Sequence, residues 1–167
     1  MSRARAPGAR ELGPHQAALY AAEAESIDGL GRRWRRRDEV QAYVDAVVDS
    51  EWFGRHWDHF VRCTVERRGH GSVWSTNHSL DAGGPAGRPT EGVILLATRG
   101  LTQPVVLHEL AHLLSSPGSG HGPPFAATFL KLVRHEMGFF AYADLLHALR
   151  RRPEFAGLRD IPGDDLA

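Results

Sequence analysis

The chain has 167 residues, with 20 basic and 20 acidic side chains, so its formal net charge is zero. This neutral balance gives no global argument for a nucleic-acid or membrane partner. A hydrophobic fraction of 42% is typical of a soluble globular protein, and the length suits one domain with a real core. We expect that domain at residues 13–155, between a disordered tail at 1–12 and a loose tail at 156–167.

Cysteine content and apolar runs narrow the class of protein further. Cys63 is the only cysteine, which excludes an internal disulfide and a zinc site built from several thiolates. The longest apolar runs, such as residues 93–97, are far too short to cross a bilayer. The basic residues near the start are not followed by an apolar stretch, so we expect no secretion signal and a cytoplasmic protein.

Two helices are predicted in the first third of the chain, with a run of arginines between them. Residues 14–26 are rich in alanine, and we expect this helix to pack on the outside of a sheet. A second helix starts at Asp38, which can form a capping box with Gln41, and its valines recur at helical spacing. The run at 32–37 holds five arginines around Trp34. It can bind phosphate and stack on a base, although the zero net charge favours a solvated surface.

The middle of the chain predicts three strands. Residues 61–66 alternate apolar and polar side chains, and residues 72–76 form a second strand that pairs with the first as a hairpin. A loop rich in glycine and proline follows at 77–89, and His78 within it is a candidate substrate contact. Residues 92–98 are apolar on both faces, which is typical of a central strand.

The most informative stretch is the helix predicted over residues 103–114, which carries the pattern H-E-x-x-H as His108, Glu109 and His112. His108 and His112 lie one turn apart on the same side, where two imidazoles can share one ion. Glu109 is rotated by about 100° from His108, so its carboxylate borders that side and can reach a water at the metal. The rest of this helix is apolar, which indicates a buried helix whose histidines need a partner such as a metal ion.

A third metal ligand must come from outside this helix, because catalytic zinc usually has three protein ligands and one open position. His121 is the favoured residue, since glycines flank it in a turn that leads into the next helix. Glu136 is the alternative, because it falls on the apolar face of the helix predicted over 124–137. The two positions lie about 22 Å apart along a continuous helix, so they cannot both bind one ion.

A last helix is predicted over residues 139–151, after Gly138 ends the preceding one. Tyr142 lies on its apolar side, where a core position is favoured over a role in stabilising an oxyanion. Taken in order, the helices, the strands and the metal-binding helix predict an α+β fold. Its small three-stranded sheet, mainly antiparallel or mixed, packs against the buried helix.

The two histidine motifs resemble those of known zinc enzymes. The sequence HELAH at 108–112, followed by HGPPF at 121–125, is similar to SprT-like zinc metalloproteases, which pair H-E-x-x-H with a downstream H-G-P-x-F. The chain also resembles, more closely in size, a family of small actinobacterial metallohydrolases that carry H-E-x-x-H. The resemblance implies a zincin-like fold, one zinc ion, the ligands His108, His112 and His121, and Glu109 as the catalytic residue.

We therefore expect a zinc-dependent hydrolase, in the first place a peptidase. In this interpretation Glu109 takes a proton from the attacking water and passes it to the leaving amine. The expected partner is a peptide or protein substrate, which a sheet edge can hold as an extended strand. Two alternatives stay open. One is a metal-stabilised binding or regulatory module without turnover, and the other is a DNA-associated protease of the SprT type that uses the arginines at 32–37.

Overall fold

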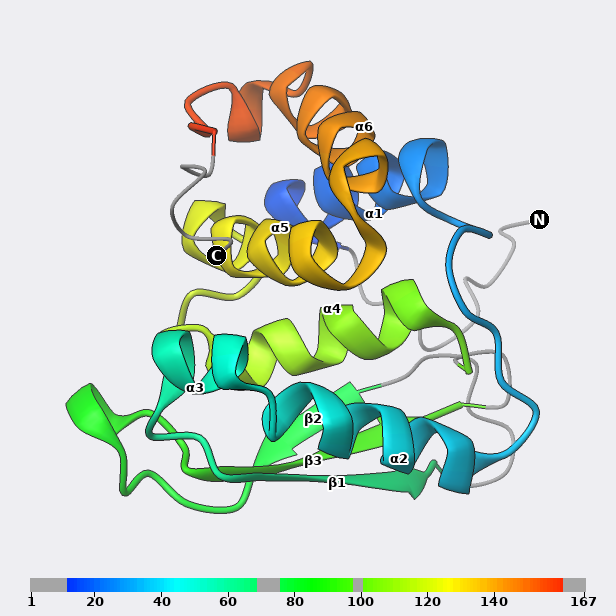
Figure 1. Ribbon diagram of the computed structural model, residues 1–167. Coiled ribbons are helices and arrows are strands. Elements are labelled where there is room, and N and C mark those ends of the chain that lie inside the picture. Colours follow the sequence, from blue (N-terminus) through cyan, green and yellow to red (C-terminus); the bar gives the residue numbers. More distant parts are fainter. Residues whose placement is uncertain (1–11, 69–75, 98–100, 161–167) are drawn as a thin grey trace, which may run out of the picture.

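The computed structural model describes residues 12–68, 76–97 and 101–160, which form a mixed α+β fold (Figure 1). Its helices are α1 (Pro14–Ser26), α2 (Arg37–Val48), α3 (Glu51–Trp57), α4 (Gln103–Leu114), α5 (Pro123–Met137) and α6 (Phe139–Arg150). Its strands are β1 (Arg62–Arg67), β2 (Thr76–Ser79) and β3 (Glu91–Leu96), and two short 3-10 helices are η1 (Pro85–Gly87) and η3 (Pro153–Phe155). The expected tail at 1–12 lies outside the described residues except for its last residue.

β3 lies in the centre of the sheet, whose strand order is β1-β3-β2. β1 runs parallel to β3, with Val65 opposite Ile94, and β2 runs antiparallel to β3, with Asn77 opposite Ile94. Neighbouring residues of a strand point to opposite faces, and both Val93 and Ile94 are buried. The prediction of a central strand in this region is therefore confirmed.

Among the described strands, β1 is not paired with the strand that follows it in the sequence, as the predicted hairpin would require. β1 and β2 each pair with β3 and not with one another, and β2 begins at Thr76, so most of it occupies the range 77–89 predicted as a loop. The physical reason is that β3 is apolar on both faces, whereas β1 is apolar on one face only and β2 consists of polar residues. The two more polar strands therefore become edges around the apolar one. The predicted turn at 68–71 and the predicted second strand at 72–76 lie outside the described residues, apart from Arg68 and Thr76.

α2 covers the outer edge of β1 through hydrogen bonds from its side chains. The Gln41 amide donates from Nε2 to the Cys63 carbonyl at 2.9 Å, and its Oε1 accepts from the Val65 N–H at 2.6 Å. Arg37 donates from Nη1 to the Val65 carbonyl at 2.9 Å. Side chains thus satisfy backbone groups that would otherwise be open to a further strand.

The N-terminus of α2 is closed by Glu39, and the predicted capping box of Asp38 with Gln41 is wrong. The Glu39 carboxylate accepts from the backbone N–H groups of Arg35 and Arg36, at 3.1 and 3.0 Å. Gln41 is instead bound to β1, because unpaired backbone groups on a strand edge need partners more than a solvated helix end does. Val40, Val44 and Val47 of the predicted valine stripe are buried, and Val48 is partly buried.

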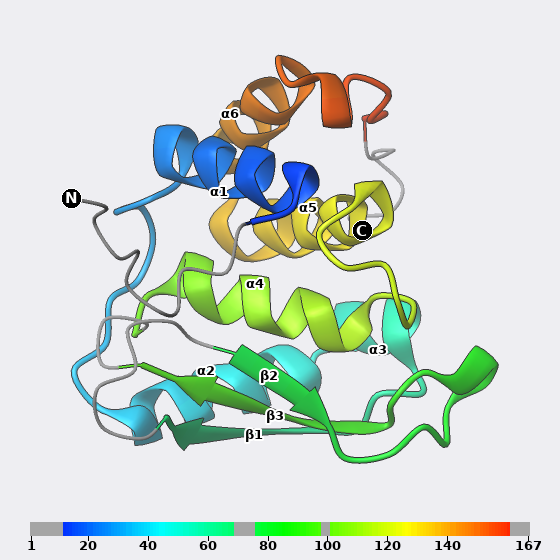
Figure 2. The same cartoon turned by 180° about the vertical axis from the view of Figure 1, so that it is seen from behind.

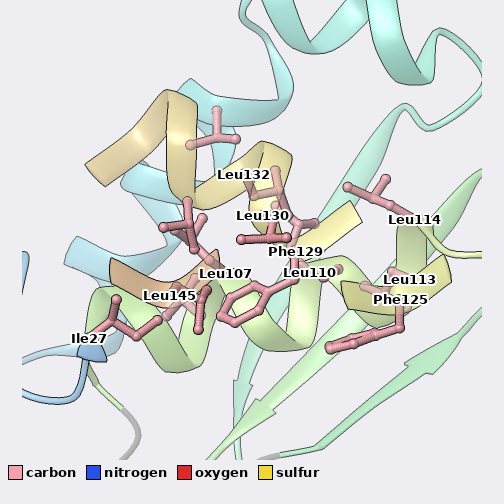
Figure 3. Close-up of a cluster of buried hydrophobic side chains, with 14 of the residues drawn as sticks. Ile27, Leu107, Leu110, Leu113, Leu114, Phe125, Phe129, Leu130, Leu132 and Leu145 are labelled. Atoms are coloured by element: carbon pink, nitrogen blue, oxygen red, sulfur yellow. The ribbon is translucent and has the colours of Figure 1, made fainter. Parts of the chain in front are cut away.

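α4 is the internal helix of the fold, and its bounds confirm the helix predicted over residues 103–114. Ten of its twelve residues are buried, because the sheet covers one side and α5 packs on the other (Figures 1 and 2). Gly92 on β3 permits this close packing, since a Cβ atom there would lie 2.6 Å from the Leu113 side chain. Leucines of α4 and phenylalanines of α5 meet in the same buried cluster (Figure 3).

α1, α5 and α6 form a layer on the side of α4 that faces away from the sheet (Figures 1 and 2). α1 packs against α6, and α5 packs against both α4 and α6. α1 has the predicted bounds, but the expectation that it packs on the outside of the sheet is wrong. The narrow apolar stripe of an alanine-rich helix can pack equally well against a helix or a sheet. In this structure its residues Leu19 and Ala22 are buried in the helical layer.

Within residues 12–68, 76–97 and 101–160, we find no helix whose length and apolar character would let it cross a membrane.

Candidate metal centre

Two of the three candidate ligands lie on α4, one turn apart. His108 and His112 have ring centroids 5.0 Å from one another, as the i, i+4 spacing predicts. His108 is only 6% exposed, whereas His112 is half-buried. The pair therefore runs from the interior of the domain toward its surface.

His121 reaches the same place from the loop between α4 and α5. Gly118 and Gly120 adopt positive φ angles of 80° and 52°, which residues with a side chain rarely adopt, and they turn the chain back toward α4. The Nε2 atom of His121 then lies 3.1 Å from the Nε2 atom of His112. In the described part of the chain, this is the only group of three or more His, Cys, Asp or Glu residues whose ligand atoms converge, all within 4.8 Å of one another.

The donor set fits a divalent ion that favours imidazole. Two nitrogen atoms bound to tetrahedral zinc lie roughly 3.3–3.4 Å apart, close to the separation of the His112 and His121 nitrogens. Burial, together with the neighbouring histidines, lowers the pKa of His112 to about 3 and that of His121 to about 4. Both rings are therefore neutral at pH 7, which is the form that binds a metal ion.

Glu23 of α1 fixes the orientation of His108 from the opposite layer. The Nδ1–H group of His108 donates to the Glu23 carboxylate at 2.6 Å, across 85 residues of sequence. Burial lowers the pKa of His108, but the Glu23 and Glu109 carboxylates more than offset burial, so the pKa lies above its usual value. A histidine whose Nδ1 is held by a carboxylate presents Nε2 to a metal, and the carboxylate makes that nitrogen a stronger donor.

We expect Glu23→Ala to weaken zinc binding by about 10- to 100-fold, the range typical of a residue that orients a metal ligand. Glu23→Gln should recover part of the affinity, because its amide oxygen can still accept from His108 Nδ1. Competition with a chromophoric chelator measures the dissociation constant. Glu25→Ala is the matched control, since it removes an equal charge from the same helix at a side chain that binds Arg152. Equal affinities for wild type and Glu23→Ala would contradict this role.

Tyr20 lies one turn before Glu23 and faces the same histidines. Its ring centroid is 5.6 Å from that of His108 and 5.4 Å from that of His121. The hydroxyl accepts a hydrogen bond from Gln16 Nε2 at 3.1 Å. Burial raises the pKa of Tyr20, Gln16 opposes this, and the nearby Glu23 and Glu109 carboxylates raise it further. The phenol therefore stays protonated at neutral pH.

Glu109 is buried beside the histidines, and Asn77 of β2 holds its carboxylate. Asn77 donates from Nδ2 to Glu109 Oε2 at 2.7 Å. Glu109 is only 6% exposed, and burial raises its pKa, although His108 and the bond from Asn77 oppose the shift. A carboxylate with a raised pKa is a stronger base, so this environment suits proton transfer at neutral pH.

The other residues singled out from the sequence lie in different surroundings. Glu136, the alternative ligand, accepts a hydrogen bond from the Tyr43 hydroxyl at 2.9 Å and another from His135 Nδ1 at 3.0 Å. Tyr142 is buried in the core of the helical layer. His78 is exposed and, by the alternation of a strand, lies on the face of β2 opposite to Asn77. The group of converging ligand atoms includes none of these three.

Sequence reasoning missed Glu23, Tyr20 and Asn77. A faint signal existed for the first two, because they are three residues apart and so share one face of an otherwise alanine-rich helix. No short-range sequence pattern, however, indicates that this face of the helix packs against residues 108–121. Asn77 could not be identified from the sequence, because its strand falls in a range that is predicted as a loop.

A comparison of the chain with models of protein families, with curated proteins and with solved structures finds no match.

Proposed function

We propose that this chain is a zinc-dependent hydrolase of zincin-like fold that cleaves peptide bonds. The observation that carries the proposal is the position of the Glu109 carboxylate, buried next to three converging imidazoles. A site that only holds a metal for stability needs the ligands but not an adjacent base with a raised pKa. His112 and His121 are half-buried, so the group is accessible from outside.

His108, His112 and His121 would hold the ion, and Glu23 would keep the His108 ring in the binding orientation. When bound, zinc polarises a carbonyl group and makes a nearby water easier to deprotonate. Glu109 then accepts the proton of the attacking water and later delivers it to the leaving amine. Asn77 holds the carboxylate in place during both transfers. The Tyr20 hydroxyl can donate a hydrogen bond to the oxygen of the attacked carbonyl.

The edge of the sheet supports a peptide as the substrate class. β2 is an edge strand, it packs against α4, and it carries Asn77. An extended peptide can therefore pair with the outer edge of β2 by main-chain hydrogen bonds and place a carbonyl near Glu109. The opposite edge, on β1, is already occupied by Gln41 and Arg37 of α2. We therefore expect the substrate to pair with the outer edge of β2, the strand that carries Asn77.

Metal removal and replacement test this proposal. We expect the purified protein with one equivalent of zinc to cleave an unfolded substrate such as β-casein, because an unfolded chain can adopt the extended form. A strong chelator should stop cleavage, and added zinc should restore it, as followed by gel electrophoresis and mass spectrometry. Zinc binding at one equivalent without cleavage of any unfolded protein tested would favour a metal-stabilised binding module instead.

A further inference from the structure

A hollow lies where the parallel strands β1 and β3 end and α2 begins. It has a volume of about 270 Å³. The described residues that line it are Arg35, Arg37, Glu66, Arg67, Leu96, Ala97 and Leu101. The hollow is separate from the metal centre, because Leu101 precedes the start of α4, whereas His112 and His121 lie at the other end of that helix.

Three arginines give this hollow an excess of positive charge. The side chains of Arg35 and Arg67 form no hydrogen bond or ion pair with the described part of the chain, and Arg37 donates only to the Val65 carbonyl. The neighbouring Arg36 is different, since Asp38 neutralises it at 2.9 Å. Guanidinium groups without anionic partners around one hollow are the arrangement that binds phosphate groups.

Glu66 also lines the hollow, but it is the one acidic side chain among the described lining residues, against three arginines. The excess of positive charge therefore remains. Arg67 lies opposite Leu96 in the β1–β3 register, and both residues line the hollow. The end of a parallel strand pair is also where open α/β sheets bind their ligands.

The floor of the hollow is apolar. Leu96 and Ala97 are buried, and Leu101 is half-buried. Trp34 does not line the hollow, because its ring packs on Tyr43 with centroids 4.9 Å apart. The arginine run therefore does not present an aromatic platform for a nucleobase, and a flat nucleic-acid surface fits poorly with a small hollow.

We propose that this hollow binds a small phosphate monoester with a short apolar group. The phosphate lies among Arg35, Arg37 and Arg67, and the apolar group covers Leu96, Ala97 and Leu101. Each part of the ligand matches one part of the lining, so neither inorganic phosphate nor an apolar alcohol alone satisfies the site. This proposal does not depend on hydrolysis at the metal centre.

Titration calorimetry with phenyl phosphate, on the zinc-loaded protein, tests the proposal. We expect phenyl phosphate to bind at least about tenfold more tightly than inorganic phosphate, because the ring covers the apolar floor. Arg35→Gln combined with Arg67→Gln should weaken binding at least about tenfold, because two charged hydrogen-bond donors are lost. Neither side chain bonds to the described part of the chain, so we expect the variant to fold, which circular dichroism checks.

Arg159→Gln is the matched control, since it removes an exposed arginine outside the hollow and should change affinity less than about twofold. Three results would overturn the proposal. One is the absence of phenyl phosphate binding at millimolar concentration, and another is equal affinity for phenyl phosphate and inorganic phosphate. The third is binding that persists in the double arginine variant but is lost in His121→Ala, which would place the phosphate at the metal centre.

Discussion

Replacing Glu109 by glutamine is expected to lower kcat for peptide cleavage by at least about 100-fold while one zinc ion stays bound. The amide has nearly the shape of the carboxylate, so the histidines keep their positions. It cannot accept a proton from water, however, and it has none to deliver to the leaving amine. Steady-state cleavage of an unfolded protein, measured beside the metal content of the same preparation, separates the two effects.

Glu136→Gln is the matched control for this variant, because it makes the same change at a carboxylate that binds Tyr43 and lies outside the group of converging ligand atoms. We expect its cleavage rate to stay within about twofold of wild type. Wild-type activity in Glu109→Gln would refute the role of Glu109 as the base. A loss of zinc from that variant would show instead that Glu109 helps to hold the ion.

Loss of the His121 ring should weaken zinc binding by more than about 100-fold, above the range for a residue that only orients a ligand. Two histidines one turn apart on α4 remain, and two ligands rarely hold zinc against a chelator. The variant His121→Ala, dialysed and analysed for metal by mass spectrometry, should therefore contain far less than one ion per chain. Its circular dichroism spectrum should match that of the wild type, because His121 lies in a surface loop between α4 and α5.

Glu136→Ala distinguishes the two ligand candidates that the sequence leaves open. We expect it to keep one zinc ion per chain and to lose some stability, because the Tyr43 hydroxyl loses an acceptor in a largely buried place. The opposite outcome, with zinc retained by His121→Ala and lost by Glu136→Ala, would overturn the ligand assignment and the function that rests on it.

The central part of the candidate site follows from short-range sequence pattern. The i, i+4 spacing of His108 and His112 and the apolar residues around them define a buried helix, and α4 has the predicted bounds. His121 comes within reach because glycines permit the turn after α4. The histidine spacing covers little more than one helical turn, and the glycines lie in one short loop. Over such short stretches, local backbone geometry determines which side chains can meet.

The remaining part of the site depends on contacts between distant segments. The bond between Glu23 and His108 joins residues 85 positions apart, and that between Asn77 and Glu109 spans 32 positions. Neither can be found without knowing which layers pack together. The same limit applies to strand pairing, since the alternation of β1 shows that it is a strand but not that β3 is its neighbour.

The occupied outer edge of β1 also limits how two copies of this chain can associate. Because Gln41 and Arg37 bind its backbone, a second molecule cannot extend the sheet there. Sheet-to-sheet dimerisation would have to use the outer edge of β2 and would cover the approach to Glu109. Self-association of that kind would compete with substrate, so the rate per molecule would fall as the protein concentration rises.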